Sequence, residues 1–110
     1  MTTHTFRALF ALTLIAGFLT TGVASAAVSC PNITRTLSFG SRGADVTTLQ
    51  TYLATDTSTY PEGVISGYFG RATEKAVQRF QASRGIVSSG TAASTGYGSV
   101  GGKTRAALAT

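Results

Sequence analysis

A glycine-to-helix motif occurs twice in the chain, and this repetition constrains the fold more than any other feature. The first copy is Phe69-Gly70-x-x-Thr73-x-x-Ala76-Val77, and the second, Val100-Gly101-x-x-Thr104-x-x-Ala107-Leu108, follows 31 residues later. Glycine lets the chain turn sharply into a helix, and a first-turn threonine can bond backbone groups that lack partners. Two copies are too few for a solenoid. The motif therefore predicts a compact bundle in which two helix starts are built alike.

The spacing of apolar residues predicts a first helix that begins near Asp45. The residues at positions i, i+3 and i+7 of this helix are Val46, Leu49 and Leu53. Ser41 is the expected N-cap, and Asp45 in the first turn complements the positive end of the helix dipole. A turn-rich segment, 55–63, ends this helix.

Two further helices are expected at the two repeated motifs. The second covers about 71–83, with Gly85 as its C′ residue. A loop rich in serine, glycine and threonine follows at 87–99, and a short third helix covers about 103–109. The inward-facing residues of these two helices are Thr73, Ala76, Val77, Phe80, Ala107 and Leu108. The pattern as a whole predicts an all-α fold, a compact three-helix bundle.

Residues 1–26 are typical of an export signal. Arg7 is followed by an apolar core at 8–19, and Ala24-Ser25-Ala26 is the small-x-small pattern that signal peptidase accepts. The apolar core is shorter than the ~20 residues of a membrane span. Cleavage after Ala26 is therefore expected, with membrane contact only transient, and an uncleaved anchor is the alternative. The remaining chain divides into a lead at 27–36 and one domain at 37–110.

The residue composition excludes most catalytic chemistry. The 110 residues include nine Lys and Arg, four Asp and Glu, one Cys and one His, and that histidine, His4, lies in the signal segment. Without this histidine neither a Ser-His-Asp nor a Cys-His arrangement can be built. A zinc site needs histidines or several cysteines, and only one cysteine remains. Two of the four carboxylates could in principle form a glycosidase pair, but so small a core can hardly enclose a cleft. No enzyme, cofactor or metal is expected.

Three motifs in a fixed order span most of the chain after the signal segment. Leu37 and Gly40 precede Arg-Gly-x-Asp-Val-x-x-Leu-Gln-x-x-Leu at 42–53, Gly-x-Phe-Gly-x-x-Thr-x-x-Ala-Val-x-x-Phe-Gln occupies 67–81, and Val-Gly-x-x-Thr-x-x-Ala-Leu closes the series at 100–108. This order resembles the peptidoglycan-binding domain found at the ends of many bacterial cell-wall hydrolases. The resemblance implies a three-helix bundle that binds bacterial cell-wall peptidoglycan without cutting it, in the secreted or envelope-associated fraction. A separate cell-wall enzyme is a further partner that it allows.

The ligand that this resemblance implies carries sugar rings and carboxylates. Arg42 and Arg71 offer bidentate carboxylate recognition beside helix starts, and Tyr68 and Tyr97 can stack on sugar rings. The candidate ligand-binding residues are Arg42, Asp45, Tyr68, Gly70, Arg71, Thr73, Tyr97 and Thr104. The two glycine-to-helix corners are expected to lie side by side and to shape one shallow receptor.

Structural roles compete with ligand binding at several positions. Asp45 is also explained as a helix-end group or as a partner of Arg42. Gln50 and Gln81 flank apolar faces and are expected to hold loops by hydrogen bonds. On the second helix Arg71, Lys75 and Arg79 fall at i, i+4 and i+8, a row that attracts an anionic polymer or simply faces solvent. Tyr52 and Tyr60 are expected to be packing residues.

Other functional classes remain open from the sequence. One is an exported protein–protein interaction module in which Cys30 links two copies through a disulfide. A nucleic-acid binder is suggested only by the net charge of +5, and no binding motif accompanies that charge, so no nucleic-acid partner is expected. A wall hydrolase is the enzymatic alternative.

Overall fold

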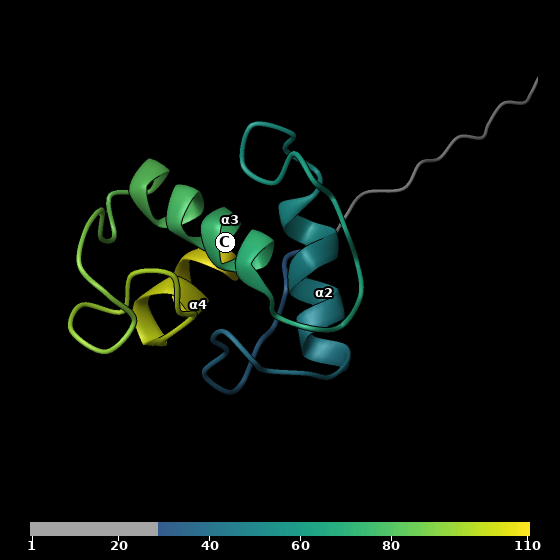
Figure 1. The fold of residues 1–110 in the computed structure, drawn as a ribbon, viewed down its shortest axis with the longest axis horizontal. Coiled ribbons are helices and arrows are strands. Elements are labelled where there is room, and N and C mark those ends of the chain that lie inside the picture. The colour runs from purple at the N-terminus through teal and green to yellow at the C-terminus, as the bar shows by residue number, and fades with distance from the viewer. Residues whose placement is uncertain (1–28) are drawn as a thin grey trace, which may run out of the picture.

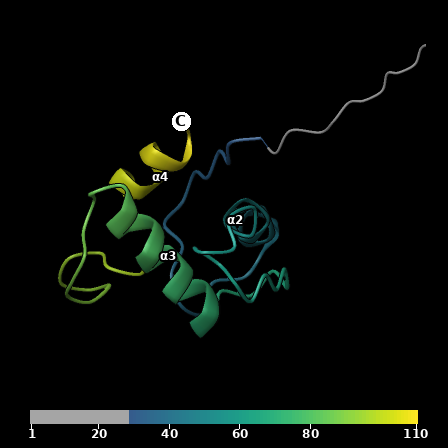
Figure 2. The same cartoon turned by 90° about the horizontal axis from the view of Figure 1, so that it is seen from above.

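The computed structural model describes residues 29–110, which form three helices (Figure 1). They are α2, Ala44–Leu53, α3, Arg71–Ser83, and α4, Gly102–Leu108. Figures 1 and 2 show α4 beside the C-terminal half of α3 and α2 toward its N-terminal end. Within the described range the backbone forms no strand, only two isolated antiparallel bridges. The predicted all-α three-helix fold is confirmed, whereas the expected signal segment lies outside the described residues.

The core contains the apolar residues that the helical spacing placed inward. Each helix contributes, and so do the apolar residues of the two repeated corners, Phe69 and Val100, which are fully buried. The other core residues include Leu37, Val46, Leu49, Leu53, Ala76, Val77, Phe80 and Leu108. Tyr60 is 2% exposed, as a packing residue should be, and Tyr52 packs partly buried against the same cluster.

A single extended segment joins the two corners. Leu37 pairs with Val100 through two backbone hydrogen bonds, of 3.3 and 2.7 Å. A few residues later the same segment pairs with the first corner. The Phe69 N–H donates to the Ser41 carbonyl, and the Phe69 carbonyl accepts the Gly40 N–H, both at 2.8 Å. The corners therefore lie along one stretch of chain, as the repeated motif suggested.

Buried glutamines hold the loops that lead into these corners. The Gln50 amide donates to the Tyr68 carbonyl and to Thr73 Oγ1, and its Oε1 accepts the Ser66 and Gly67 N–H groups, at 2.8–3.0 Å. This amide is 1% exposed. It satisfies backbone groups that a buried loop would otherwise leave unpaired, so the expected loop-holding role is confirmed.

Gln81 repeats this arrangement 31 residues later. Its amide donates to the Ser99 and Gly96 carbonyls and to Thr104 Oγ1, and its Oε1 accepts the Gly98 N–H. The two first-turn threonines are thus acceptors for glutamines of the preceding helix, not caps of their own backbone. The repeat seen in the sequence is a repeat of hydrogen bonding.

The role expected of the corner glycines is wrong in one respect. Gly70 and Gly101 have φ angles of −97° and −92° and an extended backbone that any residue can adopt. The left-handed conformation that favours glycine lies three residues earlier, at Gly67 (φ 79°) and Gly98 (φ 88°). These are the glycines whose N–H groups the two glutamines accept. The sharp turn therefore precedes each corner.

Of the two predictions about helix ends, the N-cap of α2 is wrong and the C′ residue of α3 is confirmed. Ser41 does not cap α2, because the N-cap is Gly43 and Ser41 Oγ accepts the Ser38 N–H instead. At the end of α3, Gly85 has φ 69°, and its N–H donates to the Ala82 carbonyl while the Ile86 N–H donates to the Gln81 carbonyl. This is a Schellman motif with glycine at C′, as predicted.

Candidate functional site

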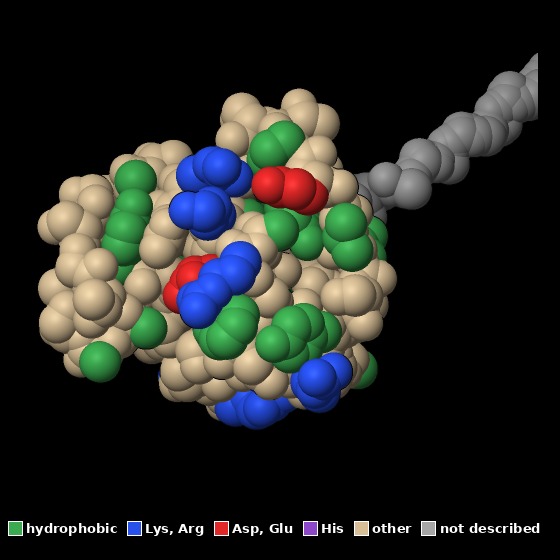
Figure 3. Space-filling model, in the orientation of Figure 1, with side chains coloured by type: hydrophobic (Ala, Val, Ile, Leu, Met, Phe, Trp, Pro, Cys, Tyr) green, Lys and Arg blue, Asp and Glu red, His purple; other side chains and the backbone are tan. Residues whose placement is uncertain are grey.

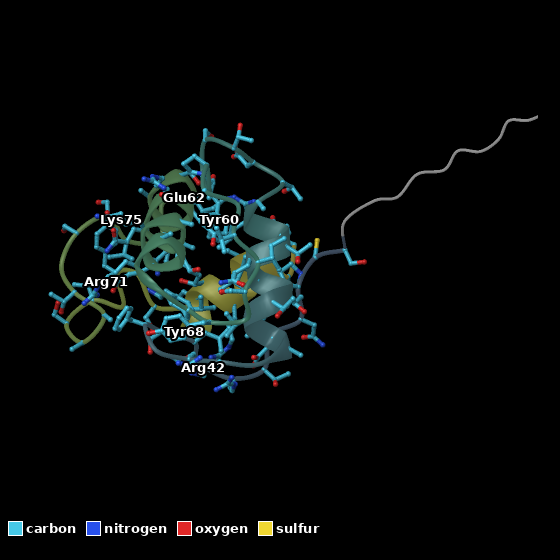
Figure 4. All side chains as sticks on the ribbon, turned by 45° about the vertical axis from the view of Figure 1, so that its right-hand side comes forward. Arg42, Tyr60, Glu62, Tyr68, Arg71 and Lys75 are labelled. Carbon is cyan, nitrogen blue, oxygen red and sulfur yellow. The ribbon has the colours of Figure 1, made fainter. Side chains whose placement is uncertain are left out.

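Two arginines and two aromatic rings form a continuous row on the surface at the first corner. The Arg42 guanidinium lies 4.3 Å from the centroid of the Tyr68 ring. That ring meets Phe39 edge-on at 6.3 Å, and the Arg71 guanidinium lies 3.9 Å above the opposite end of the row, on Phe39. We call these four residues the cation–aromatic row. Figure 4 shows its labelled members Arg42, Tyr68 and Arg71 following one another along one side of the molecule.

The stacking fixes both guanidiniums without using up their hydrogen-bond donors. Within residues 29–110 the Arg42 guanidinium makes no hydrogen bond, and the Arg71 guanidinium makes one, from Nη1 to Glu74 at 3.0 Å. The Arg71 side chain is 71% exposed. Because ring contacts occupy the guanidinium faces, the N–H groups at the edges remain available to a carboxylate. The row can therefore hold an anionic group in a defined orientation.

Phe39 is the member of the row that sequence reasoning missed. It is 44% exposed, which is unusual for a phenylalanine. It lies before α2, outside any helical periodicity, and alternation along an extended segment would place it on the same inward face as Leu37. No sequence signal therefore marked it as exposed; the turn at Phe39 and Gly40 brings its ring to the surface. Its exposure suits a ring that supports a cation or a sugar face.

A hollow of about 230 Å³ adjoins the row and is the first candidate binding site. Tyr68, Gly70, Arg71 and Thr73 all line it, so the structure brings these four predicted residues together. Tyr60, predicted only as a packing residue, also reaches the hollow. Its hydroxyl donates to the Val64 carbonyl and lies 3.4 Å from Thr73 Oγ1, so the polar floor of this hollow is internally satisfied.

Figure 3 shows how charge and apolar surface are combined on this side of the molecule. Basic and hydrophobic side chains gather on the same face, with acidic groups at two places between them (Figure 3). The predicted row on α3 is only partly free, since Arg79 donates to the Thr59 carbonyl at 3.1 Å and Arg71 is paired with Glu74. Lys75 is exposed.

Asp45 lies outside the hollow and has a structural role. Its carboxylate pairs with the Arg35 guanidinium at 2.6 Å, and the expected pairing with Arg42 is wrong. Arg35 lies in the extended lead and reaches both Asp45 and the Arg42 carbonyl, at 2.7 Å. The hydrogen bond from Arg35 lowers the pKa of Asp45, against a smaller opposing effect of desolvation. Arg35 thus anchors the backbone that presents Arg42.

The second corner has a hollow of its own, of about 270 Å³. Thr104 lines it, together with Gln81, Gly101 and residues of the preceding loop. The two hollows have no lining residue in common, so the expectation of one shared receptor is wrong. The physical reason is that each hollow forms around its own glutamine and threonine. Tyr97, half-buried in the loop, lines neither hollow.

Residues 29–110 contain neither a cluster of metal-ligating side chains nor a membrane-spanning helix. Among residues 29–110, the His, Cys, Asp and Glu side chains form no group of three that could hold a metal ion. None of the helices in the described part of the chain has the length and apolar content needed to cross a bilayer. Cys30 is an exposed free thiol at the start of this range.

Comparison with known families decides the assignment. The family model of the peptidoglycan binding domain matches residues 42–108, more than half of the chain and all three helices. The chain belongs to the peptidoglycan binding domain family. The matched region begins at Arg42 and ends at the last residue of α4, so it contains both corners of this peptidoglycan binding domain. Neither a curated protein nor a solved structure matches the chain closely enough to count as a relative.

Proposed function

We propose that this protein is exported and binds cell-wall peptidoglycan at the first corner without cutting it. Family membership supports peptidoglycan as the ligand. The observation that carries the choice of site is the cation–aromatic row, in which two guanidiniums are held on rings with their edge donors available. Peptidoglycan offers the matching groups, carboxylates on its peptides and lactyl groups and flat apolar faces on its sugars.

The geometry supports a specific division of labour within the row. Arg71 and Arg42 each present a planar fork of donors to a carboxylate. Tyr68 and the exposed Phe39 provide faces on which a sugar ring can stack. The adjoining hollow, with Val64 at its rim, accepts an apolar part of the same ligand. A polymer that carries carboxylates and sugars alternately can therefore use both kinds of contact together.

The proposal of a non-catalytic role rests on the carboxylates. A general acid in a glycosidase needs a raised pKa. Here the pKa values of Asp45 and Asp56 are both lowered, by the hydrogen bond from Arg35 and by those from Ser58 respectively. These two aspartates hold a turn and a helix start, and Glu74 is paired with Arg71, which argues against a catalytic pair of carboxylates.

Retention on purified peptidoglycan sacculi tests the proposal. Arg71→Gln and Tyr68→Ala should each weaken retention by roughly tenfold or more, because each removes a charge-assisted or stacking contact. Arg84→Gln is the matched control, since Arg84 also stacks on a ring, Phe80, at 4.6 Å but belongs to a different hollow. Equal retention of Arg71→Gln and Arg84→Gln would contradict the proposed site.

Two further measurements test the remaining parts of the proposal. Zymography on wall material should show no clearing by this chain, and clearing would contradict the non-catalytic role. The mass of the exported protein should match a chain that begins at Ala27, whereas an intact N-terminus would contradict cleavage of the signal.

A further inference from the structure

The hollow at the second corner is related to the first by the 31-residue repeat. Most residues that line the first hollow have a counterpart, 31 positions later, that lines the second. The floors correspond best: Gln50 and Thr73 in the first hollow match Gln81 and Thr104 in the second. The second hollow is thus a built feature of the fold, not an accident of loop packing.

The rims of the two hollows differ in chemical character. Tyr68 and Arg71, which give the first rim a ring and a positive charge, are replaced by Ser99 and Gly102. The loop after α3 adds two half-buried apolar side chains, Ile86 and Val87. Lys103 lines the second hollow in place of Ala72, so one positive charge remains there. The lining has no guanidinium fork for a carboxylate, however, and its two apolar side chains suit a small group that is partly apolar.

The floors of the two hollows also differ, because the threonine hydroxyl has an acceptor in the first hollow and, within the described part of the chain, none in the second. At the first corner the Thr73 hydroxyl accepts from Gln50 and can donate to the Tyr60 oxygen, 3.4 Å away. At the second corner the position of Tyr60 is taken by Thr91, which lies in the exposed loop. Thr104 Oγ1 accepts from Gln81 at 3.1 Å, but its hydroxyl hydrogen has no acceptor among residues 29–110.

This donor is unusual because the Thr104 side chain is only 3% exposed. A buried hydroxyl normally finds a partner, since burial without one costs free energy. Thr104 lines the second hollow, so an acceptor placed in the hollow can take up this hydrogen. The structure therefore calls for an oxygen acceptor at the floor and an apolar group against Ile86 and Val87.

We propose that the second hollow binds the acetamido group of an N-acetylated amino sugar. The carbonyl oxygen of that group accepts the Thr104 hydroxyl, and its methyl group packs against Ile86 and Val87. This inference rests on the proposed function, because it assigns the glycan strand of peptidoglycan to the second corner and leaves the carboxylates to the first. The domain then contacts its polymer at two separate points.

Titration of the full chain with a soluble tetramer of β-1,4-linked N-acetylglucosamine tests this inference, with NMR amide shifts as the readout. The amides of Gly96 and Ser99 should shift with this tetramer and not with cellotetraose, which has a hydroxyl in place of each acetamido group. Absence of shifts at these amides, or equal shifts with cellotetraose, would overturn the inference.

Variants of Thr104 distinguish the contribution of its hydroxyl to binding from an effect on the fold. Thr104→Val should weaken tetramer binding by about three- to tenfold, the effect of one lost neutral hydrogen bond, whereas Thr104→Ser keeps the hydroxyl and should stay within about twofold. Thr48→Val is the matched control, because Thr48 is exposed on α2, outside both hollows, and its hydroxyl donates only to the Ala44 carbonyl within residues 29–110, so tetramer binding should be unchanged. Gln81 retains two backbone acceptors in Thr104→Val, so the loop stays in place. Unchanged binding by Thr104→Val would contradict the inference.

A blocking variant tests the site without touching its floor. A side chain at Gly102 meets no atom within 4 Å at Cβ, and its φ lies outside the left-handed region, so Gly102→Tyr should fold. The new ring at the rim should reduce tetramer binding severalfold, and full binding would contradict the site. Sacculus retention of Arg71→Gln separately tests the proposed function, so failure of the inference and failure of the proposed function give different results.

Discussion

Replacement of the buried amide of Gln50 by a leucine should destabilise the domain and loosen its candidate site. The amide is 1% exposed and satisfies the Ser66 and Gly67 N–H groups and the Tyr68 carbonyl. Leucine has a similar volume and none of these hydrogen-bonding groups. In Gln50→Leu the Ser66 and Gly67 N–H groups lose their acceptor, and the Tyr68 carbonyl keeps, within residues 29–110, only the 3.3 Å bond from Ser66 Oγ.

The magnitude follows from the bonds that are lost. Each backbone bond contributes about 1 kcal/mol net, so three bonds amount to roughly 3 kcal/mol. Ser66 is exposed and can bond to water, and apolar burial of the leucine offsets a further part. The expected loss in the free energy of unfolding is therefore about 2–3 kcal/mol. For a domain of this size that corresponds to a melting temperature lower by roughly 10–20 °C.

Thermal and urea unfolding followed by circular dichroism measure this loss. Gln78→Leu is the matched control, because Gln78 is half-buried on α3 and its side chain makes no hydrogen bond within residues 29–110. Gln50→Glu adds a second check: its carboxylate can accept but not donate, so its deficit should shrink as acidification restores an O–H donor. A loss below about 1 kcal/mol in Gln50→Leu would refute the assigned loop-holding role.

Two further predictions concern backbone conformation and pH. Gly85→Ala should lower the free energy of unfolding in urea by about 1 kcal/mol, because φ is 69° at Gly85. Gly101→Ala should have little effect, because φ is −92° there and the space around Cβ is open. Equal losses in the two variants would contradict the Schellman assignment. The pKa of Asp45 is lowered by Arg35, so its stabilising effect is present above its ordinary value of 3.8 and is lost as the pH falls through that value toward the lower folded pKa. The melting temperature should fall slightly from pH 5 to pH 3, and less in Asp45→Asn; an identical fall in both would contradict the ion pair.

Much of the fold was predictable because local rules and burial agreed. Apolar spacing located all three helices, and a glycine after α3 identified the Schellman motif. The side chains expected in the core, such as Phe69 and Val77, are buried. The loop-holding roles of Gln50 and Gln81 were also predicted, since a polar residue beside an apolar face needs buried partners.

The site was less predictable because it depends on contacts between distant residues. Phe39 and Arg71 are far apart in sequence, and no local spacing indicates that they stack. The sequence suggested Arg42 as the partner of Asp45, and only the path of the extended lead brings Arg35 there instead. The division into two hollows likewise follows from three-dimensional packing. The repeated motif predicted that the corners are alike, but not that each encloses a separate space.

We propose above all that the first corner, through its cation–aromatic row, recognises peptidoglycan. An NMR titration of the labelled protein with soluble muropeptides tests it most directly. The largest shifts should fall on Phe39, Tyr68, Gly70 and Arg71, and Phe39→Ala should abolish them. Shifts confined to the opposite ends of α2 and α3, around Tyr52 and Arg84, or no shifts at all, would contradict it.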